Sequence, residues 1–90
     1  MSYYVYMLKT VKKKIITYVG YTNNLEKRLS LHNKSKGAKF TKGKKWTIIY
    51  HQKYFNKSDA LKDEYKLKKD YKLRNKIKNK FINKWKKTFL

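Results

Sequence analysis

The sequence predicts an α/β domain of the α+β type with the element order ββαβαα, in which helices flank a three-stranded, largely antiparallel sheet. Two runs rich in aromatic and β-branched residues, 3–9 and 15–21, are separated by a lysine-rich stretch short enough for a hairpin. A third such run spans 46–55, and apolar residues recur at helical spacing after the second and third runs. Ninety residues have room for one small core, so we expect 1–90 to form a single domain.

The first two strands set the positions of the tyrosines. If the turn is centred on Lys12, Tyr6 lies opposite Tyr18 in an antiparallel pair. Side chains alternate between the two faces of a strand, so Tyr4, Tyr6, Tyr18 and Gly20 share one face. The sequence therefore predicts that one face of the hairpin carries a cluster of tyrosines beside a glycine.

A first helix follows the hairpin and ends near Asn33. Asn23 is expected to be its N-cap, with Glu26 three residues later in capping-box position. At about 100° per residue, Arg28 and His32 lie on the face that the leucines of this helix bury. An arginine that reaches solvent at the edge and a hydrogen-bonded, semi-buried histidine would also explain this pattern. However, this chain uses lysine almost everywhere else, and a guanidinium can hold a phosphate through two hydrogen bonds.

The rest of the chain predicts a basic loop over 34–45, the third strand and two further helices. Asn56 or Ser58 can cap the second helix, and the third begins near Asp70. The second helix carries the apolar residues Ala60, Leu61, Tyr65 and Leu67. The third carries an apolar stripe of Leu73, Ile77, Phe81, Ile82, Trp85 and Phe89.

Glu64 lies near the middle of the apolar face of the second helix. A buried carboxylate has to be paired, protonated or bound to a metal. An ion pair with Lys68, one turn further on, is one interpretation. The other is a metal site, because Glu64 is the one acidic residue predicted to point inward and carboxylate oxygens suit Mg²⁺ or Mn²⁺.

The formal net charge of +21 predicts a polyanionic partner, with nucleic acid as the first candidate. Lysine used as a surface filler in an AT-rich genome and an anionic membrane surface are the alternatives. The chain has no cysteine and no apolar run long enough to span a bilayer. We therefore expect a cytoplasmic, nucleoid-associated protein, monomeric or weakly dimeric, that has no membrane partner.

Five blocks of sequence carry these residues. They are Tyr4-Val5-Tyr6, Tyr18-Val19-Gly20, Asn24 to Leu29 followed by His32-Asn33, Gly37 to Thr41, and Ala60 to Lys69. In this order and spacing they resemble the GIY-YIG endonuclease superfamily. The size is similar to that of its small stand-alone bacterial branch, related to the N-terminal nuclease domain of the excision-repair protein UvrC. The resemblance covers about residues 3–73.

The resemblance implies metal-assisted hydrolysis of a phosphodiester bond, with Glu64 binding a single Mg²⁺ or Mn²⁺. Arg28 would hold a non-bridging phosphate oxygen. Tyr6 or Tyr18 would position or deprotonate the attacking water, assisted by the other tyrosine or by His32. It also implies a nuclease core over about 3–73. The apolar stripe and the lysines after Asp70 separately predict a basic C-terminal helix over about 70–88.

The basic loop combines lysines with Phe40 and Trp46, a mixture suited to phosphate contacts and base stacking. No base-reading motif occurs in the sequence, so we expect recognition of branched, flapped or nicked DNA. The residues predicted to contact nucleic acid are Lys36, Lys39, Phe40, Lys42, Lys44, Lys45 and Lys68.

Three functions agree with these observations. The favoured one is a metal-dependent, structure-selective DNA endonuclease that acts in repair or recombination. The second is a non-catalytic, basic DNA-binding module on the same scaffold, because Tyr4 replaces the glycine of the first motif and Tyr21 stands where some branches have a lysine. The third is a basic adaptor that acts through a protein partner.

Overall fold

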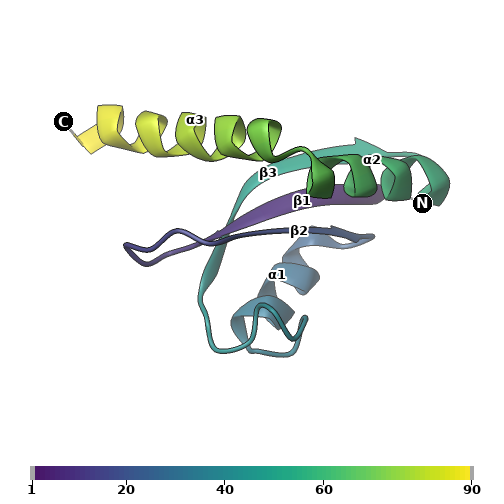
Figure 1. Ribbon diagram of the computed structural model, residues 1–90. Helices are drawn as coiled ribbons and strands as arrows, with labels where there is room; N and C mark the ends of the chain where they lie inside the picture. The colour runs from purple at the N-terminus through teal and green to yellow at the C-terminus, as the bar shows by residue number, and fades with distance from the viewer. Residues whose placement is uncertain (1, 90) are drawn as a thin grey trace.

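The computed structural model describes residues 2–89, with side chains from 2 to 84, and contains the six predicted elements in the predicted order (Figure 1). The strands are β1 (Tyr3–Thr10), β2 (Thr17–Thr22) and β3 (Trp46–Tyr54). The helices are α1 (Leu25–Asn33), α2 (Lys57–Lys69) and α3 (Tyr71–Phe89). The strands form one antiparallel sheet in the order β2-β1-β3, which confirms the predicted fold class.

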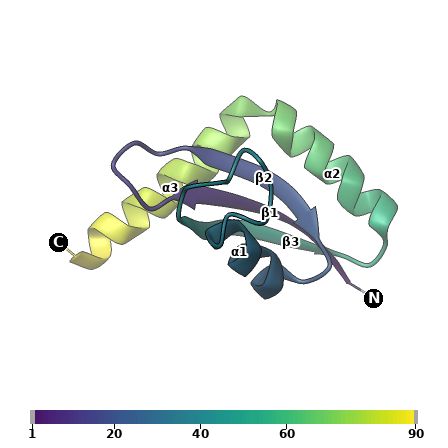
Figure 2. The same ribbon diagram turned by 90° about the horizontal axis from the view of Figure 1, so that it is seen from below.

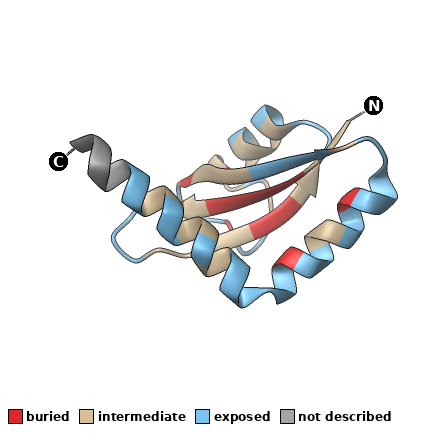
Figure 3. Ribbon diagram, turned by 90° about the horizontal axis from the view of Figure 1, so that it is seen from above, coloured by how far each residue is buried: buried red, intermediate tan, exposed pale blue. Residues whose placement is uncertain are grey.

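The helices lie on both faces of this sheet. α1 packs on one face, and α2 and α3 cover the other (Figure 1, Figure 2). Consecutive side chains of β1 point to opposite faces, so the central strand contributes to two cores and is buried along much of its length (Figure 3). The core under α1 is built on Tyr6, Leu8 and Trp46, and the core under α2 and α3 on Val5, Met7, Val19, Ala60 and Leu67.

The predicted register of the hairpin was wrong by two residues. Tyr6 pairs with Gly20 and Leu8 with Tyr18, so the turn is centred on Lys13 and not on Lys12. The hydroxyl of Thr10 closes this longer turn by donating to the carbonyl of Lys14 and accepting from the amide of Ile16. A shift of two residues leaves every side chain on its face, and the tyrosines remain together.

The start of α1 also differs from the prediction. Asn24, not Asn23, is the N-cap, and its side chain accepts a hydrogen bond from the amide of Lys27 at 3.1 Å. Glu26 is therefore one position too early for a capping box. The amide of Asn24 donates in turn to the hydroxyl of Thr22, so the chain passes from β2 into α1 through a very short turn.

The apolar face of α2 is narrower than predicted. Ala60 and Leu67 are buried, whereas Leu61 is 40% and Tyr65 60% exposed. Asn56, one of the two predicted caps, begins the helix by accepting from the amide of Asp59.

α3 begins at Tyr71, which agrees with the predicted start near Asp70. The Asp70 carboxylate accepts from the amide of Leu73 at its start. Leu73 is 42% exposed, and Ile77 packs against the core under α2. Trp85 and Phe89, also predicted for the stripe, lie outside the side chains that the structure describes.

Candidate active site

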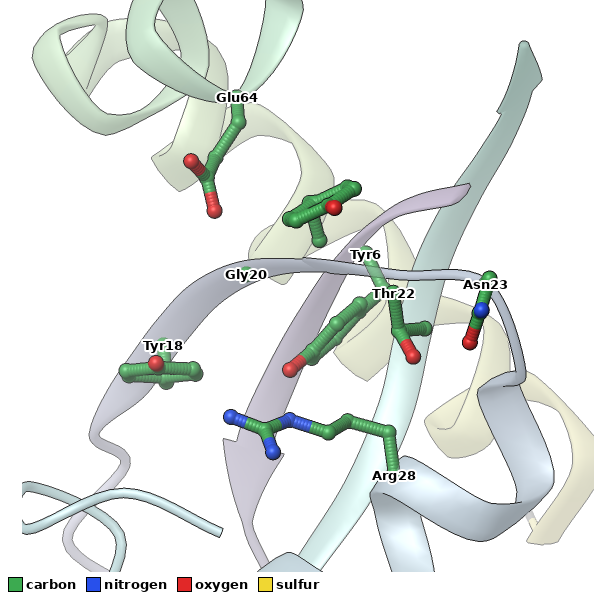
Figure 4. A pocket seen from close by; sticks show the side chains of 8 residues that line it. Tyr6, Tyr18, Gly20, Thr22, Asn23, Arg28 and Glu64 are labelled. Carbon is green, nitrogen blue, oxygen red and sulfur yellow. The ribbon is translucent and has the colours of Figure 1, made fainter. Parts of the chain in front are cut away.

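An open cleft of about 410 Å³ lies beside β2. Because β2 is an edge strand, side chains from both layers of helices can meet around it. Figure 4 shows Arg28 of α1 and Glu64 of α2 on opposite sides of this strand, with Tyr6 and Tyr18 between them. The cleft is lined by Tyr6, Tyr18, Gly20, Tyr21, Thr22, Asn23, Arg28 and Glu64. Four of the five residues predicted to be catalytic thus surround one cleft, and the fifth, His32, lies behind it.

The phenol of Tyr6 occupies the space that a side chain on Gly20 would need. A Cβ atom on Gly20 would lie 2.6 Å from Cζ of Tyr6, closer than carbon atoms approach. Tyr6 is 2% exposed, and this burial raises the pKa of its hydroxyl to about 12, although Arg28 acts in the opposite direction. In the free protein the Tyr6 hydroxyl therefore keeps its proton at neutral pH.

His32 is fully buried behind Tyr6 and does not line the cleft. Its Nε2 lies 2.8 Å from the Tyr6 hydroxyl, and its Nδ1 lies 2.8 Å from the hydroxyl of Thr41. Burial, and then the positive charge of Arg28, lowers the pKa of His32, so the ring is neutral at pH 7. We predicted that His32 assists a tyrosine at the attacking water. Because His32 lies behind Tyr6, it can act on a water in the cleft only through the Tyr6 hydroxyl.

Arg28 is partly buried, and not all of its hydrogen-bond donors have an acceptor in the described part of the protein. Its Nη2 donates to the carbonyl of Gly37 at 3.2 Å, which joins α1 to the basic loop. Its Nε is buried without a hydrogen-bond partner among the residues that the structure describes. An unpaired buried donor costs about 1–3 kcal/mol, and a phosphate oxygen in the cleft would supply the missing acceptor.

Glu64 contacts Lys68, as one of the two interpretations predicts, and it also lines the cleft. Its side chain is 18% exposed and lies 3.7 Å from the ammonium of Lys68 through Oε2, while the same side chain lines the cleft. The described residues contain no group of three or more His, Cys, Asp or Glu side chains that could hold a metal. A single carboxylate still fits Mg²⁺, which keeps several waters and takes further ligands from substrate phosphates.

A second cleft, of about 380 Å³, adjoins the first because both include Tyr18. The ring of Phe40 stacks on that of Tyr18, with centroids 6.0 Å apart and an interplanar angle of 22°. Phe40 and Lys68, two residues predicted to bind nucleic acid, meet here with Arg74. Arg74 also donates to the carbonyls of Leu67 and Lys68 at the end of α2, so the second arginine has a structural role.

The five lysines of the basic loop that are predicted to contact nucleic acid divide into two groups. Lys36, Lys39 and Lys42 have exposed side chains. Lys44 and Lys45 instead donate to backbone carbonyls, those of Phe40 at 3.4 Å and Asn33 at 3.0 Å. These two lysines therefore help to hold the loop in place.

The prediction that Trp46 offers a base-stacking surface was wrong, because Trp46 is 3% exposed. Its Nε1 donates to the carbonyl of Thr41 at 3.0 Å, and its backbone N–H donates to the side chain of Asn33 at 2.6 Å. Phe40, beside it, is 53% exposed, and the ammonium of Lys44 lies 5.7 Å from the centre of its ring.

Sequence reasoning missed the buried residues that surround His32. Thr41 is fully buried and contacts Nδ1 of His32. Gly37 lies so close that a Cβ on it would approach ring carbons of His32 to 2.8 Å. Both residues stand in the loop block of the family resemblance, which was the one available signal, because an irregular loop has no periodicity from which burial can be inferred.

Comparison with known proteins agrees with this geometry. The family model of the GIY-YIG catalytic domain matches residues 2–79. Since this is most of the chain, the protein belongs to the GIY-YIG family of nuclease domains. None of its helices, over the residues described, has the length and apolar character that crossing a bilayer requires.

Within this family the chain belongs with the small stand-alone UPF0213 proteins. It is 44% identical over 68 residues to the UPF0213 protein OB0043 of Oceanobacillus iheyensis, which covers 74% of this chain and 77% of that protein. The UPF0213 protein BLi00048/BL00536 of Bacillus licheniformis is 39% identical over 82 residues, covering 90% and 79%. The solution NMR structure of the UPF0213 protein BH0048 from Bacillus halodurans is similar with a TM-score of 0.53 at 28% identity, covering 88% of this chain and 84% of that chain.

Proposed function

We propose that this protein is a metal-dependent DNA endonuclease that hydrolyses a phosphodiester bond in the cleft beside β2. The observation that carries this proposal is the buried contact of 2.8 Å between the Tyr6 hydroxyl and Nε2 of His32. It connects a proton acceptor to a phenol that shares one cleft with Arg28 and Glu64. A tyrosine that served only to pack the sheet would need neither the cation nor the carboxylate.

The attacking water loses its proton through Tyr6. The Tyr6 oxygen takes this proton while its own proton moves to Nε2 of His32, which becomes an imidazolium. The water oxygen forms a bond to phosphorus, the bond to the leaving oxygen breaks, and the leaving oxygen takes a proton from solvent. Because the proton is relayed, no free phenolate has to accumulate from a hydroxyl whose pKa is about 12.

Arg28 holds a non-bridging oxygen of the phosphate. Its side chain lines the cleft, and its Nε has no hydrogen-bond partner among the described residues. Negative charge on these oxygens increases as the water attacks, so the contact strengthens in the transition state. Glu64 is the residue that would bind Mg²⁺ or Mn²⁺, and such an ion supplies positive charge that neutralises the phosphate and the leaving oxygen.

Charge supports DNA as the substrate. The net charge is +21, and Lys36, Lys39 and Lys42 are exposed on the loop that packs against Arg28 and Tyr18. Lysine contacts to phosphates give affinity without a sequence code. We therefore propose branched, flapped or nicked DNA as the substrate, cut during repair or recombination by a nucleoid-associated protein that acts as a monomer or weak dimer.

The contact between Lys68 and Glu64 favours a second candidate, a basic DNA-binding module that does not cut. The ammonium lies 3.7 Å from the carboxylate and already compensates its charge. To bind through Oε2, a metal ion has to displace this ammonium. If the metal cannot do so, the protein keeps its affinity for DNA and has no nuclease activity.

Incubation of the purified protein with nicked, flapped, branched and single-stranded DNA, in Mg²⁺, Mn²⁺ or EDTA, separates the two candidates. The nuclease cuts with metal and not with EDTA, and Glu64→Gln binds DNA but does not cut it. Glu26→Gln is the matched control, because Glu26 is exposed on α1 and should cut like the wild type. Tight binding of all four substrates without cutting by the wild type would contradict the nuclease and support the binding module.

A further inference from the structure

The loop that follows α1 encloses the His32 ring. Thr41 and His32 are both fully buried, and Thr41 does not line either cleft. The loop is held from two directions, since Arg28 donates to the carbonyl of Gly37 and Trp46 donates to the carbonyl of Thr41. Both ring nitrogens therefore have protein groups as partners. The donors and acceptors among these groups indicate which ring nitrogen carries the His32 proton.

The hydroxyl of Thr41 has one proton, two lone pairs and three partners. They are the carbonyl of Ala38 at 3.0 Å, the amide of Ala38 at 3.2 Å and Nδ1 of His32 at 2.8 Å. The amide of Ala38 can only donate, so it takes one lone pair. If the hydroxyl gives its proton to the Ala38 carbonyl, Nδ1 of His32 donates to the second lone pair, and all three contacts are satisfied.

The contact of Nε2 with the Tyr6 hydroxyl, on the opposite side of the ring, indicates the same tautomer. Among the described residues, Nε2 of His32 is the one acceptor within hydrogen-bond distance of the Tyr6 hydroxyl. With the ring proton on Nδ1, the Tyr6 O–H donates to the lone pair of Nε2. With the ring proton on Nε2, that lone pair is lost, and the proton of an almost fully buried hydroxyl has no protein acceptor.

We propose that Thr41 is a positioning residue that holds His32 in the tautomer with its proton on Nδ1, so that the lone pair of Nε2 faces Tyr6. The catalytic consequence rests on the proposed nuclease function, whereas the tautomer is a property of the free protein. In the reaction, the imidazolium that forms keeps its Nδ1–H on Thr41. His32 can therefore accept the Tyr6 proton without turning its ring.

NMR measures the tautomer directly. His32 and His51 are the two histidines of the chain, so His51→Gln leaves a single imidazole, whose two ¹⁵N signals show which nitrogen is protonated. We expect protonated Nδ1 with Thr41 or Thr41→Ser, and loss of this preference in Thr41→Val, which has a similar shape and no hydroxyl. A proton on Nε2 in the protein with Thr41 intact would overturn the proposal, even if Thr41→Val does not fold.

Cleavage kinetics give the second readout. Thr41→Val should lower kcat by about 10²-fold, the effect of a misplaced catalytic group, with no change in DNA affinity, and Thr41→Ser should restore most of the rate. An unchanged kcat in folded Thr41→Val would overturn the positioning role. If the wild type cuts no DNA, the nuclease proposal fails, but the NMR spectrum still decides whether Thr41 sets the tautomer.

Discussion

Gly20 lies directly opposite Tyr6 in the antiparallel pair of β1 and β2, and its missing side chain is what makes room for the Tyr6 phenol. The glycine at this position is therefore explained by packing. Its Cβ would meet both Tyr6 and the ring of Tyr18, at 3.1 Å from the latter. Gly20 thus fixes where both tyrosines stand relative to the cleft that they line.

Gly20→Ala should displace the Tyr6 phenol. We expect a loss of about 1–3 kcal/mol in the free energy of unfolding from overpacking. In the folded variant, the rate of DNA cleavage should fall by about 10²-fold through misplacement of Tyr6. Urea unfolding and single-turnover kinetics check the two effects. Gly43→Asn is the control, because Gly43 has a φ of +79° that asparagine tolerates and no neighbours within 4 Å of its Cβ position. Wild-type stability and rate in Gly20→Ala would disprove the packing role.

His32 makes the stability of the protein sensitive to acid. Its pKa in the folded protein is lowered by burial and by Arg28, so the unfolded chain binds a proton at His32 near pH 6.5 while the folded protein resists it. The stability due to His32 is therefore present above about pH 6.5 and is lost as the pH falls through the lowered pKa.

Thermal melts between pH 8 and pH 5 check this dependence on His32. The Tm of the wild type should fall more steeply on the acid side than the Tm of His32→Gln. His51→Gln, a change at the exposed second histidine, should keep the steep dependence of the wild type. Parallel curves for the wild type and His32→Gln would show that His32 does not contribute.

The exposed lysines of the loop should determine the salt dependence of DNA binding. Replacing Lys36, Lys39 and Lys42 together by glutamine should weaken binding to all duplex sequences about equally. It should reduce the slope of log K against log salt by about 0.9 for each lysine that contacts a phosphate. The matched control replaces Lys12, Lys13 and Lys14 in the turn between β1 and β2, which removes the same charge from another exposed segment. Equal losses in both triple variants would show that net charge, and not this loop, determines binding.

Much of the fold could be predicted because the periodic signals are strong. Alternation in the strands and helical spacing in α1 and α3 gave the element order. The register of the hairpin could not be predicted, because the turn around Lys13 is lysine-rich and has no glycine, proline or asparagine to define its type. It depends on the side chain of Thr10, which closes the turn through two hydrogen bonds and resembles any other strand threonine in the sequence.

The residues of the candidate site could be predicted from the sequence, but the hydrogen bonds between them could not. Arg28, His32 and Glu64 stood out as polar residues on otherwise apolar helical faces. Which tyrosine hydroxyl forms a hydrogen bond with His32 could not be inferred, because that depends on the distance between β1 and α1 across the sheet face. The contact from Thr41 depends on the path of an irregular loop, which periodicity does not describe.

In the proposed reaction, Tyr6, hydrogen-bonded to His32, relays the proton of the attacking water. Single-turnover cleavage by Tyr6→Phe, with protein in excess over DNA and in saturating metal, tests it most directly, because this change removes one buried oxygen and little volume. We expect the rate to fall by about 10²–10⁴-fold with DNA affinity unchanged, and Tyr18→Phe to lose much less. Cleavage by Tyr6→Phe at the wild-type rate would contradict the account.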